Sequence, residues 1–231
     1  MTPKAIMIFA AGRGTRMGAL TKDRPKPLIE VGGRALIDHA LDLTRDPAVA
    51  PLNCVANLHY LGDLLRHHLA GSGVVLSDES DMLRETGGGL KKALPLLGEG
   101  PVFTLNSDAV WDGPNPLRTL VNGWDDDRMD GLLLLIPREN ALGHKGLGDF
   151  LVDEEGRLSR GAGLVYSGAQ IIRTDGLSTI QDPVFSLNRL WDDMLRKGTL
   201  YGAVHSGRWC DVGQPESLPL AEALLRGSDV H

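Results

Sequence analysis

Short apolar runs alternate with amphipathic segments along the first half of the chain. Four apolar runs predict buried strands, at residues 5–10, 52–57, 73–76 and 101–105. Apolar positions at helical spacing predict helices between them, at residues 35–44, 61–69 and 89–97. This alternation predicts an α/β fold with a doubly wound, mostly parallel, Rossmann-like sheet. The carboxyl ends of such strands share one edge, where ligands bind.

The second half of the chain has a mixed pattern. Further strands, some of them antiparallel, are predicted at 131–136, 148–152, 164–172 and 200–205. Helices are predicted at 191–196 and 215–225, whereas Pro25 and Pro27 exclude a helix between residues 22 and 28. No repeat, low-complexity tract or linker interrupts the pattern, so a single domain over residues 1–231 is expected.

Composition narrows the class of protein. The 231 residues are 42% hydrophobic and 23% charged, which is typical of a globular chain with a full core. The net charge of −6 argues against nucleic acid or an anionic membrane as a partner. No apolar run approaches the ~18 residues of a membrane span, and no secretory signal is present, so a cytoplasmic protein is expected. The two cysteines, Cys54 and Cys210, are expected to be free buried thiols.

One short segment has a net positive charge, although the whole chain is negative. Residues 13–26 hold five basic residues and one acidic residue, a net charge of +4, next to Gly12 and Gly14. Backbone amides near glycine approach phosphates closely, so a small polyanion site is predicted. The dinucleotide pattern fails because Met17 replaces its third glycine, and no Gly-Lys-Ser/Thr of a P-loop is present. The residues that stand there are Ala10-Ala11-Gly12-Arg13-Gly14-Thr15-Arg16-Met17 and then Arg24-Pro25-Lys26-Pro27-Leu28.

Two aspartates and a glycine triplet are the other candidates. Asp108 ends the segment Leu105-Asn106-Ser107-Asp108, and Asp211 lies in Trp209-Cys210-Asp211-Val212-Gly213. Either alone is equally typical of a turn or a helix cap. Magnesium, however, often needs only one or two carboxylates beside substrate phosphates. Gly87, Gly88 and Gly89 open a predicted helix at a cost to its stability, which predicts close approach of the backbone to a flat ligand.

The glycine loop followed by Pro-Lys-Pro-Leu resembles the signature of the sugar-1-phosphate nucleotidyltransferases, over about residues 4–225. The resemblance implies that Asp108 and Asp211 bind Mg²⁺, and that Arg16, Lys26 and Asp108 are the catalytic residues. It implies a triphosphate loop made by Ala10, Ala11, Gly12, Gly14, Thr15 and Arg16. It also implies nucleoside contacts from Gly87, Gly88, Gly89 and Asn106, with Ser77-Asp78-Glu79 near the edge of the base. Gly18-Ala19 and Ser107 depart from the family pattern, which has Arg-Pro and Gly there.

Within the family, residues 85–98 resemble the N-acetylmuramate-1-phosphate uridylyltransferases of peptidoglycan recycling, as do Gly146-Leu147-Gly148-Asp149-Phe150 and Tyr166-Ser167-Gly168. This implies transfer of a uridylyl group from a nucleoside triphosphate, UTP, to that sugar 1-phosphate, with pyrophosphate released. Residues about 1–110 would form the nucleotide-binding half and about 111–225 the sugar-binding half. The implied sugar contacts are Glu85, Gly148, Asp149, Ser167 and Gly168.

The lactyl carboxylate of such a sugar would need a cation. Arg138, Lys145 and Arg160 are candidates, and the sequence does not rank them. Arg160 lies in Leu158-Ser159-Arg160-Gly161, where many glucose- and mannose-1-phosphate enzymes carry Glu-Lys-Pro.

Other functions stay open at this point. One is guanylyl, thymidylyl or uridylyl transfer to mannose, heptose or glucose 1-phosphate. Another is a non-catalytic regulator that binds nucleotide sugars, although such a protein would be expected to have lost Lys26 or an aspartate. A nicotinamide oxidoreductase is disfavoured by the missing third glycine. The sequence gives neither the oligomeric state nor the number of metal ions.

Overall fold

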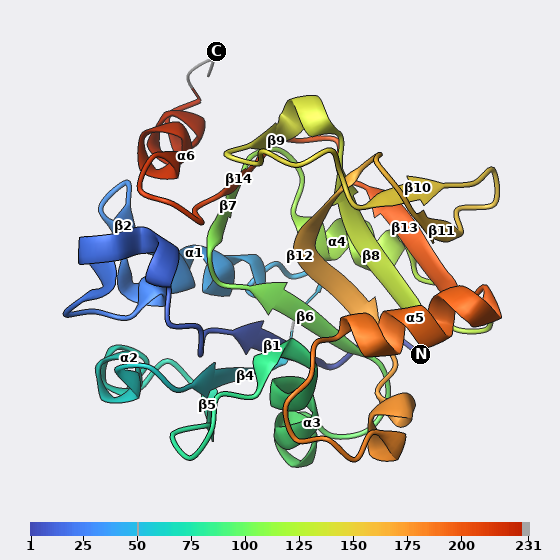
Figure 1. Ribbon diagram of the computed structural model, residues 1–231, viewed down its shortest axis with the longest axis horizontal. Helices are drawn as coiled ribbons and strands as arrows, with labels where there is room; N and C mark the ends of the chain where they lie inside the picture. The colour runs from blue at the N-terminus through green and yellow to red at the C-terminus, as the bar shows by residue number, and fades with distance from the viewer. Residues whose placement is uncertain (50, 228–231) are drawn as a thin grey trace.

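A seven-stranded sheet forms the centre of the computed structural model, which describes residues 1–49 and 51–227 (Figure 1). Its strands are β1 (Ala5–Phe9), β4 (Asn53–Leu58), β5 (Val75–Asp78), β6 (Val102–Asn106), β8 (Gly131–Ile136), β12 (Val165–Ile172) and β13 (Leu200–Val204). Their order is β13-β8-β12-β6-β1-β4-β5. Neighbouring strands are parallel, except that β12 runs antiparallel to β8 and β6. The predicted α/β fold, mostly parallel with an antiparallel portion in the second half, is confirmed.

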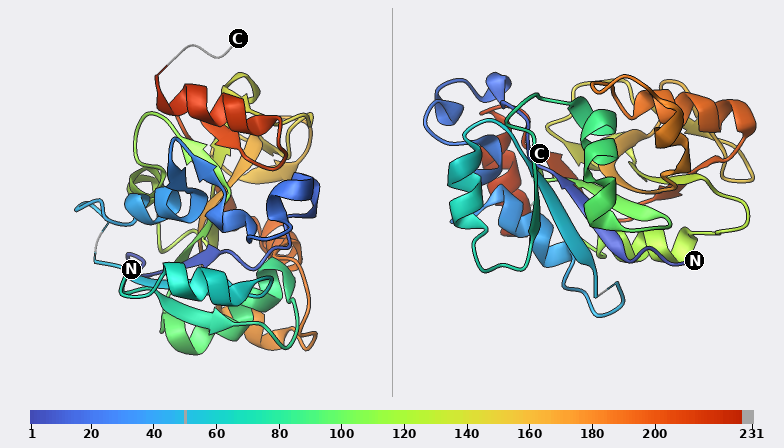
Figure 2. Two further views of the ribbon diagram at one scale, coloured as in Figure 1. Left: turned by 90° about the vertical axis from the view of Figure 1, so that its left-hand side faces the viewer. Right: turned by 90° about the horizontal axis from the view of Figure 1, so that it is seen from below.

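Helices cover both faces of this sheet (Figure 2). One face carries α1 (Leu36–Leu43), α2 (Gly62–His68) and α4 (Pro116–Gly123), and the other carries α3 (Glu85–Leu97) and α5 (Asn188–Lys197). Apolar side chains of β1 point alternately to the two faces of the sheet, so both faces must be covered by helices. Ile6 and Ile8 pack into the first layer, while Ala5 and Met7 pack into the second. The sheet is therefore doubly wound.

A smaller sheet joins distant parts of the chain above the main one. It consists of β7 (Ala109–Trp111), β14 (Trp209–Asp211) and β9 (Ala141–Leu142), with β14 in the middle. Helix α6 (Ser217–Leu225) packs on β14 and β7. The remaining strands form two hairpins, β2 (Glu30–Val31) with β3 (Arg34–Ala35), and β10 (Phe150–Val152) with β11 (Leu158–Arg160). The sequence pattern predicted none of the strands at 109–111, 141–142 and 209–211, because their pairing is long-range.

Three local differences from the prediction have clear causes. Pro25 and Pro27 do not leave the chain irregular, because a single 3₁₀ turn, η2 (Lys26–Leu28), begins directly after Pro25 and accommodates Pro27 in its first turn. Helix α3 begins at Glu85, four residues earlier than predicted, and includes the three glycines. Helix α4 was not predicted, although its start carries a clear signal. The side chain of Asn115 caps the helix by accepting from the Leu117 amide at 2.9 Å, just before Pro116 at the first position.

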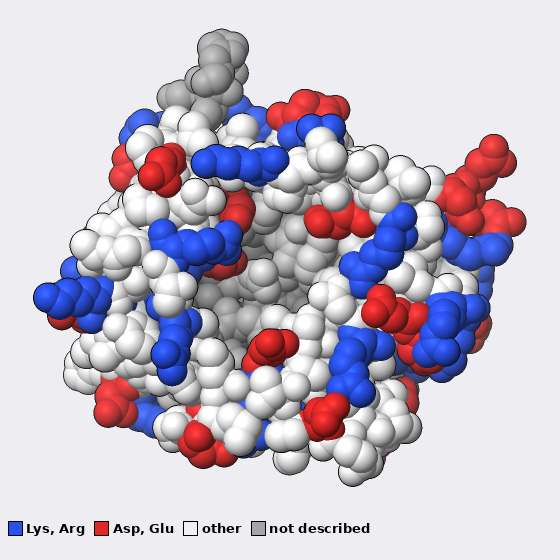
Figure 3. Space-filling view, viewed as in Figure 1, with Lys and Arg blue, Asp and Glu red and all other residues white. Residues whose placement is uncertain are grey.

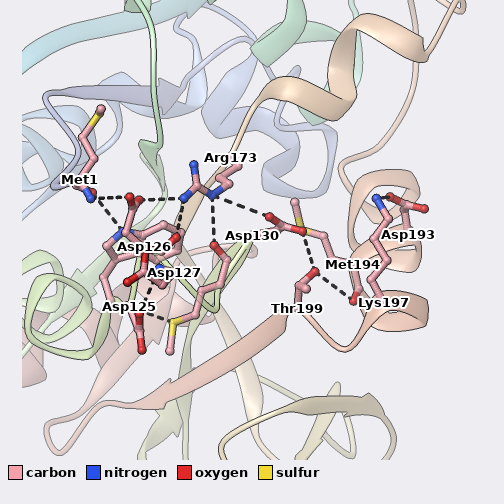
Figure 4. A network of polar contacts seen from close by, with 12 residues as sticks. Met1, Asp125, Asp126, Asp127, Asp130, Arg173, Asp193, Met194, Lys197 and Thr199 are labelled. Atoms are coloured by element: carbon pink, nitrogen blue, oxygen red, sulfur yellow. Dashed lines mark hydrogen bonds and ion pairs between the residues drawn. The ribbon is translucent and has the colours of Figure 1, made fainter.

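Polar side chains tie the sheet together at the edge opposite the carboxyl ends of β1 and β6. The Arg173 guanidinium lies 3.0 Å from Asp126 Oδ1 and 3.7 Å from Asp130 Oδ1 (Figure 4). The Thr199 hydroxyl donates to Asp130 Oδ2 at 2.8 Å. These contacts join the start of β8, the end of β12 and the turn before β13. They therefore lie at the end of the strands opposite the glycine loop and Asp108.

Both cysteines are free, as expected, with Cys210 buried and Cys54 half-buried. Burial raises the pKa of the Cys210 thiol to about 12. Within residues 1–49 and 51–227, no helix combines the length and the apolar character that crossing a membrane would require.

The structure predicts an unequal cost for removing two indole donors. Trp191 Nε1 donates to the fully buried Gln170 Oε1 at 2.9 Å, whereas Trp124 Nε1 donates to the Met1 carbonyl oxygen at the surface. Trp191→Phe leaves a buried acceptor without its donor, so we expect the free energy of unfolding in urea to fall by ~1–3 kcal/mol. The control, Trp124→Phe, is expected to lose less than ~1 kcal/mol. Equal losses in the two variants would contradict this account of the core.

Candidate functional site

The carboxyl ends of β1 and β6 lie side by side and lead into two of the predicted motifs. The register pairs Phe9 with Asn106, so the glycine loop begins beside the residues that lead to Asp108. Ser107 stands where the family pattern has glycine, and its buried hydroxyl donates to the Phe9 carbonyl oxygen at 2.7 Å. This departure from the pattern adds a link between the two strand ends.

A second pairing brings Asp211 to the same place. In the ladder between β7 and β14, Asp211 stands opposite Ala109. The amide of Val212 donates to the carbonyl oxygen of Asp108 at 2.9 Å. Two aspartates about a hundred positions apart in the sequence are thus neighbours, held by backbone hydrogen bonds.

The charges around Asp211 show what this proximity does. Burial, and next the negative charge of Asp108, raise the pKa of Asp211 above the ordinary carboxyl value. Nearby basic groups act in the opposite direction, and these are Lys26, Arg16 and His144. Both predicted cations therefore lie near enough to Asp211 for their charges to lower its pKa. Magnesium often uses only one or two carboxylates with phosphates and water, so Asp108 and Asp211 fit a magnesium ion.

Lys26 is fixed between the glycine loop and Asp108. Its side chain is only 10% exposed, and Nζ lies 2.7 Å from Asp108 Oδ2. The loop approaches it closely, since a Cβ on Gly14 would lie 2.8 Å from Lys26 Cβ. Gly14 also has φ of 62°, which favours glycine. The loop backbone and the lysine stem therefore determine each other's positions.

The rest of the glycine loop is open to the ligand side and anchored from behind. A Cβ on Gly12 would meet no atom within 4 Å. Thr15 and Arg16 are exposed at the start of a 3₁₀ helix, η1 (Thr15–Thr21). Behind them, the buried Met17 packs in a cluster with residues of β7, β14 and α6. Gly18, one of the two departures from the pattern at 18–19, has φ of 58° and kinks this helix, a conformation that other residues rarely adopt.

A cleft of about 240 Å³ opens beside this cluster. Figure 3 shows the face of the molecule that is hollowed near its centre, with acidic and basic side chains around the hollow. Glu85 contributes to the lining from the start of α3, with φ of 58°, which is uncommon outside glycine. The lining consists of Phe9, Ala11, Gly12, Asn57, Glu79, Leu83, Glu85, Thr86, Asn106 and Asp108. Five of these ten were predicted as contacts, namely Ala11, Gly12, Glu85, Asn106 and Asp108, and Glu79 was expected near the edge of the base.

The glycine triplet has a different explanation from the one that the sequence suggested. The amides of Gly87 and Gly88 both donate to the Phe185 carbonyl oxygen, at 2.9 and 3.0 Å. A Cβ on Gly88 would collide with the Pro183 carbonyl oxygen, and one on Gly89 would lie 2.8 Å from Glu79 Oε1. All three are buried against the chain itself. Packing against the chain therefore accounts for the glycines that were predicted to approach a flat ligand, and Glu85 and Thr86 line the cleft.

A buried chain of hydrogen bonds connects the glycine loop to α3. Asn57 Oδ1 accepts from the Ala10 amide at 2.7 Å, and Asn57 Nδ2 donates to Glu79 Oε1 at 2.7 Å. Glu79 Oε2 accepts from the Arg84 amide at 3.2 Å. Burial raises the pKa of Glu79, although these hydrogen bonds lower it. Asn57 was missed from the sequence, where a polar residue ending an apolar strand was the available signal.

Of the five predicted sugar contacts, Glu85 lines the cleft, and Gly168 and Asp149 lie next to it. Gly168, with φ of 84°, occupies a bulge in the pairing of β12 with β8. A Cβ there would lie 2.7 Å from Asn106 Cγ, so the glycine makes room for a cleft residue. Asp149 lies close by, because its Oδ2 accepts from the Tyr166 amide, two residues before Gly168, at 2.8 Å.

The other two predicted sugar contacts serve the fold. Ser167 is only 1% exposed, and its hydroxyl donates to the Leu134 carbonyl oxygen at 2.8 Å. The hydroxyl of Ser167, which was predicted to contact the sugar, is therefore engaged inside the sheet. Gly148 has φ of 98° and packs directly against the backbone of Gly163, where a Cβ would collide.

Comparisons with known proteins identify the family of this chain. Residues 6–147 match the family described as the MobA-like NTP transferase domain. The chain is 40% identical to N-acetylmuramate alpha-1-phosphate uridylyltransferase of Caulobacter vibrioides over an alignment of 237 residues. This alignment covers 96% of this chain and 97% of the relative. It is 33% identical to the protein of that name from Neisseria meningitidis serogroup B, over 94% and 96% of the two chains.

A solved structure supports the fold in the same way. HddC from Yersinia pseudotuberculosis, complexed with GMP-PN, has a TM-score of 0.76 with 20% identity over 96% of this chain and 99% of that one. At this level of identity the likeness concerns the fold alone.

The hydrogen-bond chain through Glu79 leads to a stability prediction. In Glu79→Gln, one amide oxygen cannot accept from both Asn57 Nδ2 and the Arg84 amide, so a buried donor loses its acceptor. We expect the free energy of unfolding in urea to fall by ~1–3 kcal/mol, and nucleotide binding measured by calorimetry to weaken. Asp78→Asn is the matched control, since its exposed carboxylate pairs with Arg66, and it is expected to cost less than ~1 kcal/mol. Equal effects would show that the chain of hydrogen bonds has no special role.

Proposed function

The chain belongs to the MobA-like NTP transferase family and is a nucleotidyltransferase, and from this premise we propose that it transfers a uridylyl group from UTP to N-acetylmuramate α-1-phosphate. Pyrophosphate is the second product. The two relatives that match this chain over nearly their whole length bear the name of that activity. The proposed setting is peptidoglycan recycling in the cytoplasm. The family membership disfavours the regulator and the nicotinamide oxidoreductase that the sequence left open.

The observation that carries the proposal is the meeting of opposite charges at one end of the cleft. Asp108 and Asp211 are backbone neighbours there, Lys26 contacts Asp108 at 2.7 Å, and the charge of Arg16 reaches Asp211. The reaction brings two polyanions together, and two unit charges ~4 Å apart interact by ~4 kcal/mol at an effective dielectric of ~20. Neutralising that repulsion is the main task of such a site.

In the proposed mechanism, an oxygen of the sugar 1-phosphate attacks the α-phosphorus of UTP in line with the leaving group. The new P–O bond forms as the bond to the β-phosphate oxygen breaks, and pyrophosphate leaves with that electron pair. The attacking oxygen is already ionised, so no general base is needed. Asp108 and Asp211 would hold Mg²⁺, which supplies positive charge to the phosphate oxygens when bound.

The basic residues have separate parts in this proposal. Lys26 is held rigidly by the glycine loop, and its ammonium group stabilises phosphate charge from the side of Asp108. Arg16 is exposed at the loop and contacts the triphosphate. The backbone around Gly12 has open space beside it, where its amides would bind phosphate oxygens. The cleft lined by Asn57, Glu79 and Thr86 takes the uridine.

A substrate panel tests the proposal. Pyrophosphate release is measured with UTP, CTP, GTP and dTTP, each against the 1-phosphates of N-acetylmuramate, N-acetylglucosamine, glucose and mannose. We expect kcat/KM to be highest for UTP with N-acetylmuramate 1-phosphate, by at least ~10-fold, which corresponds to ~1.4 kcal/mol. Equal turnover with glucose 1-phosphate would reject the proposed sugar, and a preference for GTP would reject the proposed base.

The acidic pair is tested by substitution. Asp108→Asn should lower kcat at least ~100-fold, because a group that stabilises charge in the transition state is lost. Asp112→Asn serves as the control, since that carboxylate pairs with Arg208, and should retain most of the wild-type rate. Circular dichroism and thermal unfolding check that both variants fold. A near-normal kcat for Asp108→Asn would remove this residue from the mechanism.

A further inference from the structure

Arg160 is held in place by aromatic rings and polar partners on the sugar side of the molecule. Its Cζ lies 4.9 Å from the ring centroid of Phe150 and 5.7 Å from that of Trp191. Its Nη2 donates to Asn188 Oδ1 at 2.7 Å and to Asp192 Oδ1 at 2.9 Å. Stacking and two hydrogen bonds thus fix the plane of the guanidinium, and side chains ordered in this way lose little entropy when they bind a ligand.

Part of this guanidinium is still able to bind a ligand. Both hydrogen bonds use Nη2, and the Nε and Nη1 groups make no hydrogen bond to any other residue within 1–49 and 51–227. The side chain is 43% exposed. Asp192 is 62% exposed, so solvent screens its charge and Arg160 keeps most of its attraction for a second anion.

Contacts connect Arg160 to the residues predicted at the sugar. In the β10–β11 hairpin Arg160 pairs with Phe150, and the amide of Gly161 donates to the Asp149 carbonyl oxygen at 3.2 Å. Asp149 in turn accepts from the Tyr166 amide, and the Tyr166 ring lies edge-on to Trp191 at 4.9 Å. Tyr166 is two residues from Gly168, which packs on the cleft residue Asn106. These contacts link the hairpin that carries Arg160 to the bulge of β12 that packs on the cleft residue Asn106.

The other two candidate cations lack such support. Arg138 and Lys145 are both exposed, and neither forms an ion pair or a stacking contact within the described ranges 1–49 and 51–227. Fixing a free side chain of this length costs up to ~2 kcal/mol of rotamer entropy. Arg160 has already been ordered by the fold, so it is the candidate that binds a carboxylate at the lowest entropic cost.

We propose that Arg160 is the specificity-determining residue that binds the lactyl carboxylate of the sugar 1-phosphate. This inference rests on the proposed function, because only that substrate carries the carboxylate. N-acetylglucosamine 1-phosphate is the matched probe, since it is the same sugar without the lactyl group. Arg160 would thereby separate two substrates that differ by one charged substituent.

The test compares both sugar phosphates in wild type and in Arg160→Gln. For N-acetylmuramate 1-phosphate we expect KM to rise ~10- to 100-fold, the loss of one charge-assisted hydrogen bond, while kcat changes much less. The preference for N-acetylmuramate over N-acetylglucosamine 1-phosphate should fall by the same factor. Calorimetric binding of the two sugar phosphates gives this ratio without turnover. Arg160→Lys should restore part of the preference, because it keeps the charge but not the planar fork.

Lys145→Gln and Arg138→Gln are the matched controls, and each should keep the wild-type preference. If Arg160→Gln weakens both sugars equally, the residue acts only through the fold, and the inference is overturned. It is also overturned if the variant keeps the wild-type preference, or if a control variant loses it instead. A wild-type protein that does not prefer N-acetylmuramate 1-phosphate would instead refute the proposed function, and this inference with it.

Discussion

The site depends on two carboxylates that the backbone holds together against their mutual repulsion. The pairing of β7 with β14 places Asp211 beside Asp108, and the pKa of Asp211 is raised by burial and by that neighbouring charge. A lysine that is itself buried offsets part of the repulsion from 2.7 Å away. Such an arrangement attracts cations, because a bound cation relieves the repulsion between the two carboxylates.

Much of this could be predicted from local sequence. The glycine loop and Asp108 each follow a short apolar strand, and parallel strands bring their carboxyl ends to one edge, so their proximity follows from the pattern. Asp211 is different, because nothing near residue 211 reveals that it pairs with a strand beginning at residue 109. Its position was expected only through the resemblance to a family, and the structure supplies the physical reason.

The differences between the expected and the observed surroundings of these residues share one cause, which is that one residue type can be present for more than one reason. Gly88 and Gly89 were predicted to contact a ligand, yet Gly88 packs against Pro183 and Gly89 against Glu79. Ser167 was read as a sugar contact, yet it is buried and donates to Leu134. Conversely, Asn57 was not predicted as a site residue, although its side chain links the Ala10 amide to Glu79. Small and polar residues are chosen by partners that are distant in sequence, so local pattern alone does not distinguish packing from binding.

The late position of β14 has a consequence for how the molecule forms during synthesis. During synthesis the glycine loop, Lys26 and Asp108 leave the ribosome long before residues 209–211. A nascent chain can therefore build most of the main sheet while Asp211 is still missing. The insertion of β14 between β7 and β9 is therefore a late folding event, made by contacts of high sequence separation. Until then the growing chain has only Asp108 of the proposed acidic pair, because Asp211 reaches its neighbour only when β14 pairs with β7.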